Sequence, residues 1–443
     1  MRLFILILCL FSAQIADAQV GLPSVRVPLP GAGLPSLPTA TLPRESDLDA
    51  EFRGTDLRNL RALQIRTLLR THRDVIEADP HGNPIVRGEV LVVAPSAAAF
   101  QAAAAAGFSV VRESTLDALE LRLVVLRVSS GTARSLARLQ ALDPNGIYDF
   151  NHIYIESGTS ITANVFAPQT PHVDEEAGAV AVAVAVASTT RIGLIDGGID
   201  PAHEVFSGLT LHQHGCSGRV VPYEHGTAVA SLMVGRAPSF HGAAPGSELY
   251  AADVYCGLPT GGAADVVAES FSWLVKEKVP VINVSLVGPP NRVLEGVVQR
   301  VIAAGHIVVA AVGNDGPAAA PLYPAAWPGV VGVTGVDARR RVLVEAERGA
   351  QVKFAAPGAQ MAAAKSRSGY TLVRGTSFAA PIVAGLLALN LPAPDKAAAD
   401  RALVALAQEA VDLGAPGADP VYGFGLVGEA LRRQPVLTKL RAD

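Results

Sequence analysis

Short apolar runs alternate with stretches of helical periodicity through the second half of the chain. The runs at 192–195, 281–285 and 307–311 consist mainly of apolar residues, and stretches of helical character lie between the strand-like runs. Continuous apolar runs separated by helices are typical of parallel strands that are buried on both faces. We therefore predict a three-layer α/β domain over 191–432, with one parallel sheet between two layers of helices.

A different pattern precedes this domain, between residues 88 and 155. Strand-like and helix-like segments follow one another there in the order strand, helix, strand, strand, helix, strand. This order is the ferredoxin-like arrangement, so we predict a small α+β domain. The predicted strands are 89–94, 108–113, 119–128 and 147–155, and the predicted helices are 96–106 and 132–142.

The remaining segments are read from their composition. Residues 1–18 carry one arginine, an apolar run and small residues at the end, which predicts a secretory signal peptide too short to span a membrane. We expect a secreted or periplasmic protein without a stable membrane anchor. Residues 19–47 form a Pro-rich linker, 48–87 a helical segment with several arginines, 156–190 a flexible connector and 433–443 a tail.

Charge and cysteine content narrow the choice of partners. A net charge of −4 gives no argument for nucleic-acid binding. Cys9 lies in the signal peptide, so Cys216 and Cys256 are the cysteines of the exported chain, either paired as a disulfide or as two separate thiols. His212 and His214 precede Cys216 without the spacing of paired metal ligands, so we predict no metal site.

Four polar residues lie at predicted strand ends and helix starts, where the functional sites of parallel α/β sheets are usually found. Asp196 ends the first strand of the sheet, His225 and Ser377 each open an apolar helix, and Asn314 follows the strand at 307–311. Attack of a hydroxyl on a carbonyl carbon needs a base, and the base needs an acidic partner that fixes its tautomer. An amide near the reacting carbonyl can stabilise the negative charge that develops on oxygen.

The motifs around these residues resemble those of the subtilisin-like (subtilase) serine peptidases. They read Asp-Gly-Gly-Ile at 196–199, His-Gly-Thr at 225–227, Gly-Asn at 313–314 and Gly-Thr-Ser-Phe-Ala-Ala-Pro at 375–381, in the order of that family. The resemblance covers roughly 191–431. It implies that Ser377 is the nucleophile, His225 the general base and Asp196 its partner. Asn314 and the backbone N–H of Ser377 would then form the oxyanion hole.

The resemblance also implies where a peptide substrate binds. Ser285, Leu286 and Gly288 would form the edge on which an extended peptide adds as a strand, and Gly313 would lie beside the scissile bond. Gly197 stands where the family commonly has a small hydroxyl residue, so we expect a looser turn there.

We further expect a broad preference for apolar side chains, because the residues near the scissile bond, Ala310, Ala311 and Gly313, are small. Family members bind structural calcium, but the sequence offers no acidic cluster for it, so we predict no cofactor.

The expected function is therefore that of a serine endopeptidase made as a zymogen. Residues 88–155 would act as its own inhibitor, and the chain would cut itself between Glu156 and Pro171. Two alternatives remain at this point: a catalytically inactive binding protein with a peptidase fold, and an esterase or peptide ligase that uses the same site.

Overall fold

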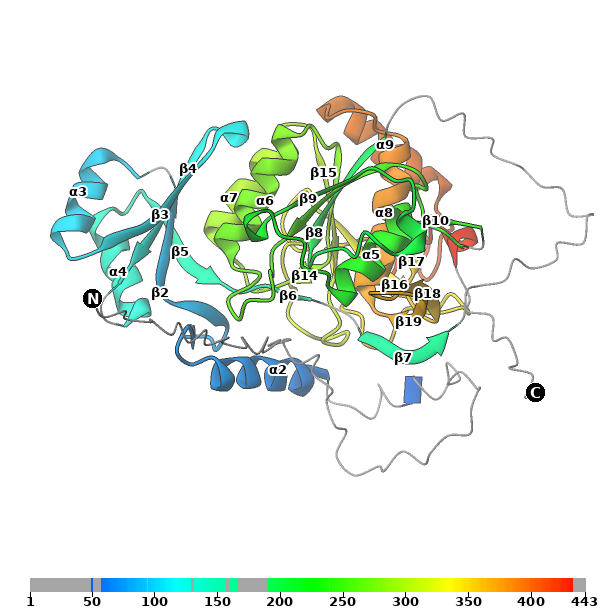
Figure 1. Ribbon diagram of the computed structural model, residues 1–443, viewed down its shortest axis with the longest axis horizontal. Coiled ribbons are helices and arrows are strands. Elements are labelled where there is room, and N and C mark those ends of the chain that lie inside the picture. The colour runs from blue at the N-terminus through cyan, green and yellow to red at the C-terminus, as the bar shows by residue number, and fades with distance from the viewer. Residues whose placement is uncertain are drawn as a thin grey trace, which may run out of the picture.

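The chain forms two α/β units joined side by side (Figure 1). This computed structural model describes residues 49–50, 57–93, 95–128, 131–156, 159–165, 190–238 and 240–432. The predicted signal peptide, the Pro-rich linker at 19–47 and the tail at 433–443 lie outside these residues. Within the described ranges, no helix combines the length and the apolar character needed to cross a membrane.

The larger unit is built on a seven-stranded sheet in the order β17-β16-β15-β13-β8-β12-β9. All neighbouring strands in it run parallel, which confirms the predicted parallel sheet. The strands are β8 (Arg191–Asp196), β9 (Leu211–His214), β12 (Glu248–Asp253), β13 (Val281–Val284), β15 (Ile307–Ala311), β16 (Val331–Val336) and β17 (Val352–Pro357).

Helices cover both faces of this sheet, so the predicted three-layer architecture is confirmed. Side chains alternate along the central strand: Leu194 of β8 lies in the core beneath α5 and α8, whereas Ile195 lies in the core beneath α6 and α7. Both cores are almost entirely apolar. The helices are α5 (Glu224–Val234), α6 (Ala264–Lys276), α7 (Arg292–Ala303), α8 (Thr376–Leu389) and α9 (Lys396–Glu409), the last packed against α8.

The smaller unit is an antiparallel sheet whose strands follow the order β3-β4-β2-β5. This order, with two covering helices, is the predicted ferredoxin-like fold. One face packs on α3 and α4, and the other contacts α6 and α7 of the larger unit. The elements are β2 (Pro84–Val93), α3 (Ala97–Ala105), β3 (Ser109–Leu116), β4 (Leu121–Arg127), α4 (Thr132–Leu142) and β5 (Ile147–His152).

The helical segment predicted at 48–87 is only partly helical. The helix α2 (Leu57–Thr71) is present, but β1 (Ile76–Ala78) pairs with the start of β2 as a hairpin. A turn over 79–83 makes this hairpin, in which the Asp79 carboxylate accepts hydrogen bonds from the backbone of His81 and Asn83. The Asp-Pro-His-Gly-Asn sequence is a turn signal, and the helical prediction for this part was wrong because it ignored it.

The connector predicted at 156–190 begins with strands rather than with a loose chain. Strand β6 (Ile155–Glu156) pairs with β14 (Leu286–Val287), and β7 (Thr159–Val165) pairs with β19 (Tyr370–Arg374), which also pairs with β18 (Met361–Ala364). Both pairings add a segment to an edge of the larger unit, and a sequence read locally gives no sign of such an edge. Residues 166–189 lie outside the described part of the chain.

Candidate active site

Asp196 and His225 meet at the carboxyl end of β8. The two oxygens of the Asp196 carboxylate lie 3.0 and 2.9 Å from Nδ1 of His225, and both side chains are buried. The N–H of Gly197 donates to the same carboxylate at 2.6 Å and so helps to fix its position. An Nδ1–H bonded to a carboxylate leaves Nε2 as the basic nitrogen.

Ser377 is the second residue of α8 and lies beneath the loop that carries Gly375. Pro381 has no N–H, so the carbonyl oxygen of Ser377 cannot receive the usual helical bond from four residues ahead. The hydroxyl of Ser285 donates to that oxygen instead, at 3.2 Å. The ring of Phe378 lies 5.3 Å from the His225 ring, which places the base beside the start of this helix.

Asn314 lies in the loop after β15 and faces the same helix start. Its side-chain oxygen accepts the backbone N–H of Thr376 at 3.1 Å, and the Thr376 hydroxyl accepts the N–H of Gly313 at 3.3 Å. These two bonds fix the Asn314 amide next to Ser377. The structure thus places Asp196, His225, Ser377 and Asn314 near one another.

The predicted substrate edge is occupied by the chain itself. Leu286 pairs with Glu156 and Val287 with Ile155, antiparallel, so β6 adds to this edge. Gly288 does not pair with β6: its backbone bonds Tyr323, and its missing side chain leaves room for the ring of Tyr154. The side chain of Ser285 has a structural role, because it is fully buried between Asn283 and Ser377.

Tyr154 anchors the incoming strand. Only 1% of its surface is exposed, its hydroxyl donates to the carbonyl of Pro289 at 2.9 Å and its N–H donates to the carbonyl of Gly262 at 2.8 Å. Its aromatic ring therefore fills a pocket of the larger unit, two residues before the end of β6.

Glu156 ends β6 close to His225. Burial of its carboxyl group raises the pKa of Glu156. His225 and the Tyr223 hydroxyl lower this pKa, and the nearby Asp196 raises it further. The residue as a whole keeps partial exposure. A Cβ on Gly197 would lie 2.4 Å from the Tyr223 ring, so this glycine makes room for Tyr223.

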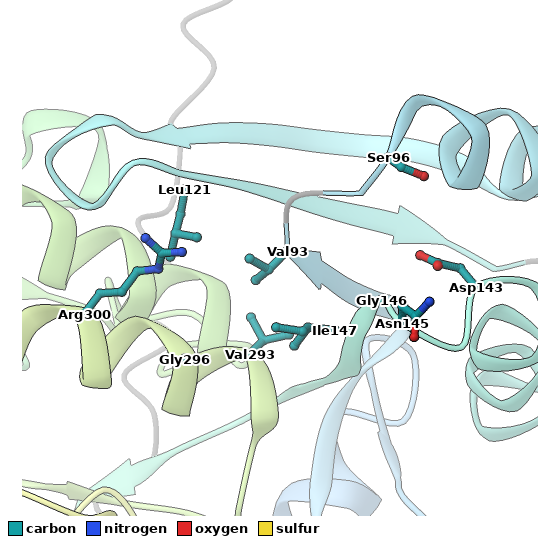
Figure 2. Close-up of a pocket in the computed structure, with 10 residues that line it drawn as sticks. All are labelled: Val93, Ser96, Leu121, Asp143, Asn145, Gly146, Ile147, Val293, Gly296 and Arg300. Atoms are coloured by element: carbon teal, nitrogen blue, oxygen red, sulfur yellow. The ribbon is translucent and has the colours of Figure 1, made fainter.

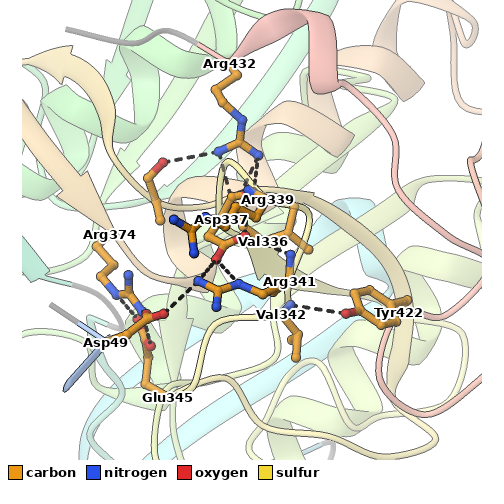
Figure 3. A network of polar contacts seen from close by, with 11 residues as sticks. Asp49, Val336, Asp337, Arg339, Arg341, Val342, Glu345, Arg374, Tyr422 and Arg432 are labelled. Atoms are coloured by element: carbon orange, nitrogen blue, oxygen red, sulfur yellow. Dashed lines mark hydrogen bonds and ion pairs between the residues drawn. The ribbon is translucent and has the colours of Figure 1, made fainter. Parts of the chain in front are cut away.

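A buried ionic network stands directly before the nucleophile loop (Figure 3). Arg374 is 1% exposed and ends β19, three residues before Ser377. Its guanidinium bonds Glu345 at 2.7 and 2.9 Å and the carboxylate of Asp49 at 2.9 Å. Arg341 also bonds Asp49, at 3.0 Å. A residue of the N-terminal segment is thus held next to the active site.

Cys216 and Cys256 are joined in a disulfide, with their Cα atoms 5.2 Å apart. Among the described residues, the group suited to metal ligation is this pair with Asp253, and bonded cysteines are not thiolate ligands. His212 stacks on Tyr250, away from any such group.

A cavity of about 320 Å³ lies between the two units and not at the catalytic residues (Figure 2). Val93 and Leu121 of the small sheet face Val293 and Arg300 of α7 across it. Ser96 and Asp143 also line it, but no histidine does, so it does not offer the serine-histidine-carboxylate combination of the site described above.

Three residues of this neighbourhood escaped the sequence analysis: Tyr223, Arg374 and Glu347. The last is a fully buried carboxyl group near Gly313. Tyr223 stands two residues before the histidine motif and Arg374 directly before the serine motif, so position next to a motif was the available signal.

Known proteins were compared with the chain and with its structure. A sequence profile of the Subtilase family matches residues 187–425, more than half of the chain. Subtilisin DY of Bacillus licheniformis is 31% identical over 249 residues, which cover 54% of this chain and 89% of that protein. The minor extracellular protease Epr of Bacillus subtilis (strain 168) is 29% identical over 245 residues, 54% of this chain but only 37% of Epr.

Among solved structures, fervidolysin from Fervidobacterium pennivorans, a keratinolytic enzyme related to subtilisin, aligns with a TM-score of 0.63. The alignment covers 80% of this chain and 62% of fervidolysin at 19% identity, so this likeness concerns the fold alone. The family assignment comes from the sequence matches: the chain belongs to the subtilase family of serine endopeptidases.

Proposed function

We propose that this chain is an exported serine endopeptidase that works through an Asp196-His225-Ser377 triad and processes its own precursor. The observation that carries the proposal is the bond between the buried Asp196 carboxylate and Nδ1 of His225, in a site that also holds Ser377 and Asn314. Export is supported by the apolar N-terminal sequence at 1–18.

In this mechanism the oxygen of Ser377 attacks the scissile carbonyl carbon while His225 takes the hydroxyl proton. The carbonyl oxygen becomes negative and is stabilised by the Asn314 amide and by the backbone N–H of Ser377 at the start of α8. The C–N bond then breaks, and His225 gives its proton to the leaving amine. In the second half of the reaction, His225 takes a proton from water, and the water oxygen attacks the acyl carbon. The bond to the Ser377 oxygen then breaks, and His225 returns the proton to this oxygen.

The proposed precursor is one in which the small unit inhibits the larger one. Strand β6 lies on the edge predicted for substrate, and Tyr154 fills an adjoining pocket. Polar contacts hold the units together: Arg112 bonds Glu89 of its own sheet and Asp265 of α6, and the Asn291 amide donates to the carbonyl of Phe150. We place the cleaved bond between Glu156 and Pro171.

The test is a comparison of purified wild-type protein with the Ser377→Ala variant. A fluorophosphonate probe should label the wild type at Ser377, and the wild type should hydrolyse a casein substrate. The variant should fold, as judged by circular dichroism and thermal unfolding, yet show neither labelling nor hydrolysis. Near-normal hydrolysis by the variant would refute the triad. An unlabelled, inactive but folded wild type would favour an inactive binding protein.

A further inference from the structure

Two carboxyl groups at the loop that carries Asn314, the buried Glu347 and the partly buried Asp315, take no part in the proposed triad. Glu347 is fully buried; its N–H donates to the carbonyl of Gly313 at 3.2 Å and its Oε2 accepts the N–H of Leu322 at 3.2 Å. Within the described part of the chain its Oε1 has no hydrogen-bond partner. That oxygen would lie 2.5 Å from a Cβ on Gly313, so it points at the loop that carries Asn314. Asp315 is the next residue of the loop.

A cation from elsewhere in the chain lies against this pair. The Nε of Arg61, in α2, lies 3.2 Å from a carboxylate oxygen of Asp315, and only 14% and 18% of the two side chains are exposed. A cavity of about 280 Å³ adjoins the contact, lined by both residues with Ala62, Ile65 and Leu322. The space beside the oxyanion loop therefore accommodates a guanidinium group already.

The position of Glu347 and Asp315 relative to the scissile bond determines which part of a substrate would contact them. Asn314 would face the scissile carbonyl oxygen, so the side chain of the residue that carries this carbonyl is the substrate side chain nearest the loop. Ala310 and Ala311, on which the expectation of an apolar pocket rested, are buried within β15. The open side of Gly313 faces Glu347 and Leu322 instead.

We propose that Glu347 and Asp315 form a cation subsite that takes the arginine or lysine side chain of the substrate residue carrying the scissile carbonyl. Arg61 occupies this subsite in the precursor and leaves it to the substrate after processing. The inference rests on the proposed function, because it assigns a specificity to the same site. It replaces the apolar preference expected from the sequence.

The charge state of the subsite gives the preference a pH dependence. Burial and the neighbouring Asp315 raise the pKa of Glu347 to about 8, while the Leu322 N–H and Arg61 act in the opposite direction. Burial also raises the pKa of Asp315, against the effect of Arg61. Only the ionised carboxyl attracts a guanidinium, so the preference for arginine should grow as pH rises through about 8.

The test compares two peptides that differ only at the scissile residue, arginine in one and its neutral isostere citrulline in the other. Processed wild-type protein should have a kcat/KM at least about tenfold higher for the arginine peptide at pH 9, and a smaller ratio at pH 6. Glu347→Gln should bring the ratio toward one and abolish its pH dependence. Glu409→Gln, an exposed site on α9, removes a charge elsewhere and should change nothing.

Hydrolysis of both peptides at equal rates would overturn the subsite while leaving the endopeptidase proposal intact. A second measurement does not need activity. In the uncut Ser377→Ala chain, Arg61→Ala and Asp315→Asn should each lower the Tm, and the double variant should lower it by less than the sum of the two. Additive losses would overturn the occupation of the subsite by Arg61.

Discussion

At the scale of single residues, the loop after β15 and the start of α8 hold each other through two side chains. Asn314 accepts the N–H of Thr376, and Thr376 accepts the N–H of Gly313. The reciprocal bonds leave little freedom for the Asn314 amide to rotate. Such a preorganised donor acts on charge that appears only in the transition state, so its loss should affect turnover and not substrate binding.

Asn314→Ala should therefore lower kcat by about 10²–10³, equivalent to roughly 2.7–4 kcal/mol, with little change in KM. Steady-state kinetics on a peptide substrate measures both constants. Asn390→Ala, at the exposed C-terminal end of α8, is the matched control and should retain wild-type rates. An effect of Asn314→Ala confined to KM would contradict the oxyanion role.

Gly197 has a packing reason to lack a side chain. A Cβ there would come within 2.4 Å of the Tyr223 ring and 2.7 Å of the Tyr223 Cβ. Gly197→Ala should lower the free energy of unfolding by about 1–3 kcal/mol and reduce activity, because Tyr223 precedes the helix that carries His225. Adding Tyr223→Ala should restore part of the stability, as measured by chemical denaturation. Equal stability of wild type and Gly197→Ala would show that the ring moves aside without cost.

At the scale of elements, the sequence predicted best those helices and strands that depend on local patterns of apolar residues. The buried strands at 192–195, 281–285 and 307–311 were correctly placed because continuous apolar runs between helices have few other interpretations. Strand β7 was missed, since its partner β19 lies some two hundred residues later in the chain. Edge pairing depends on which edge is free in the folded molecule, and local periodicity carries no information about this.

The polar contacts around the site show the same limit. The motifs predicted Asp196, His225, Ser377 and Asn314, because each stands at a strand end or a helix start. No spacing rule links Asp49 to Arg374, which are 325 residues apart in the chain and meet only in the folded molecule. Whether a charged residue is buried and paired can be read only from the folded structure, where its partner is identified.

Docking of β6 on the larger unit should depend on pH through Glu156. Burial raises the pKa of Glu156 in the docked strand above its ordinary value, so ionisation of this carboxyl opposes docking. The contribution of Glu156 to the stability of the docked strand is fully present below the ordinary pKa of a glutamate. It is lost as pH rises through the raised pKa of the docked state. After processing, the lag before peptide hydrolysis should shorten with increasing pH in the wild type. Glu156→Gln should make the lag longer and independent of pH, and an unchanged pH profile in that variant would contradict this reading.

The disulfide closes a loop between two connecting segments. Cys216 and Cys256 are 40 residues apart, a separation for which a cross-link contributes about 2–4 kcal/mol by limiting the unfolded chain. Labelling of denatured, non-reduced exported protein with a thiol reagent should give no modified cysteine. The Cys216→Ser, Cys256→Ser double variant should lose stability by this amount. Two labelled cysteines per chain would reject the bond.

At the scale of the whole molecule, two separate parts of the N-terminal half contact the catalytic unit. The small sheet packs on α6 and α7 and sends β6 along the substrate edge. The segment before it reaches the other side of the site, where Asp49 bonds Arg374 and Arg61 bonds Asp315. If the N-terminal half inhibits the larger unit as proposed, release of activity would require both sets of contacts to open, and a cut in the chain after Glu156 would favour this opening by freeing the N-terminal half.

The proposed maturation can be followed through the fragments that it produces. In the proposed precursor, β6 is held along β14 and would present the following residues to Ser377 at a high effective concentration, so even a weak cleavage sequence should be cut. Purified wild-type protein should separate into a fragment ending between Glu156 and Pro171 and a catalytic fragment of about 270–290 residues, as shown by intact mass. Ser377→Ala should remain one chain. The N-terminal fragment, added back, should inhibit the catalytic fragment, and its Tyr154→Ala form should inhibit much less because the anchoring ring is lost. A wild-type precursor that stays whole and is fully active would refute self-processing and inhibition together.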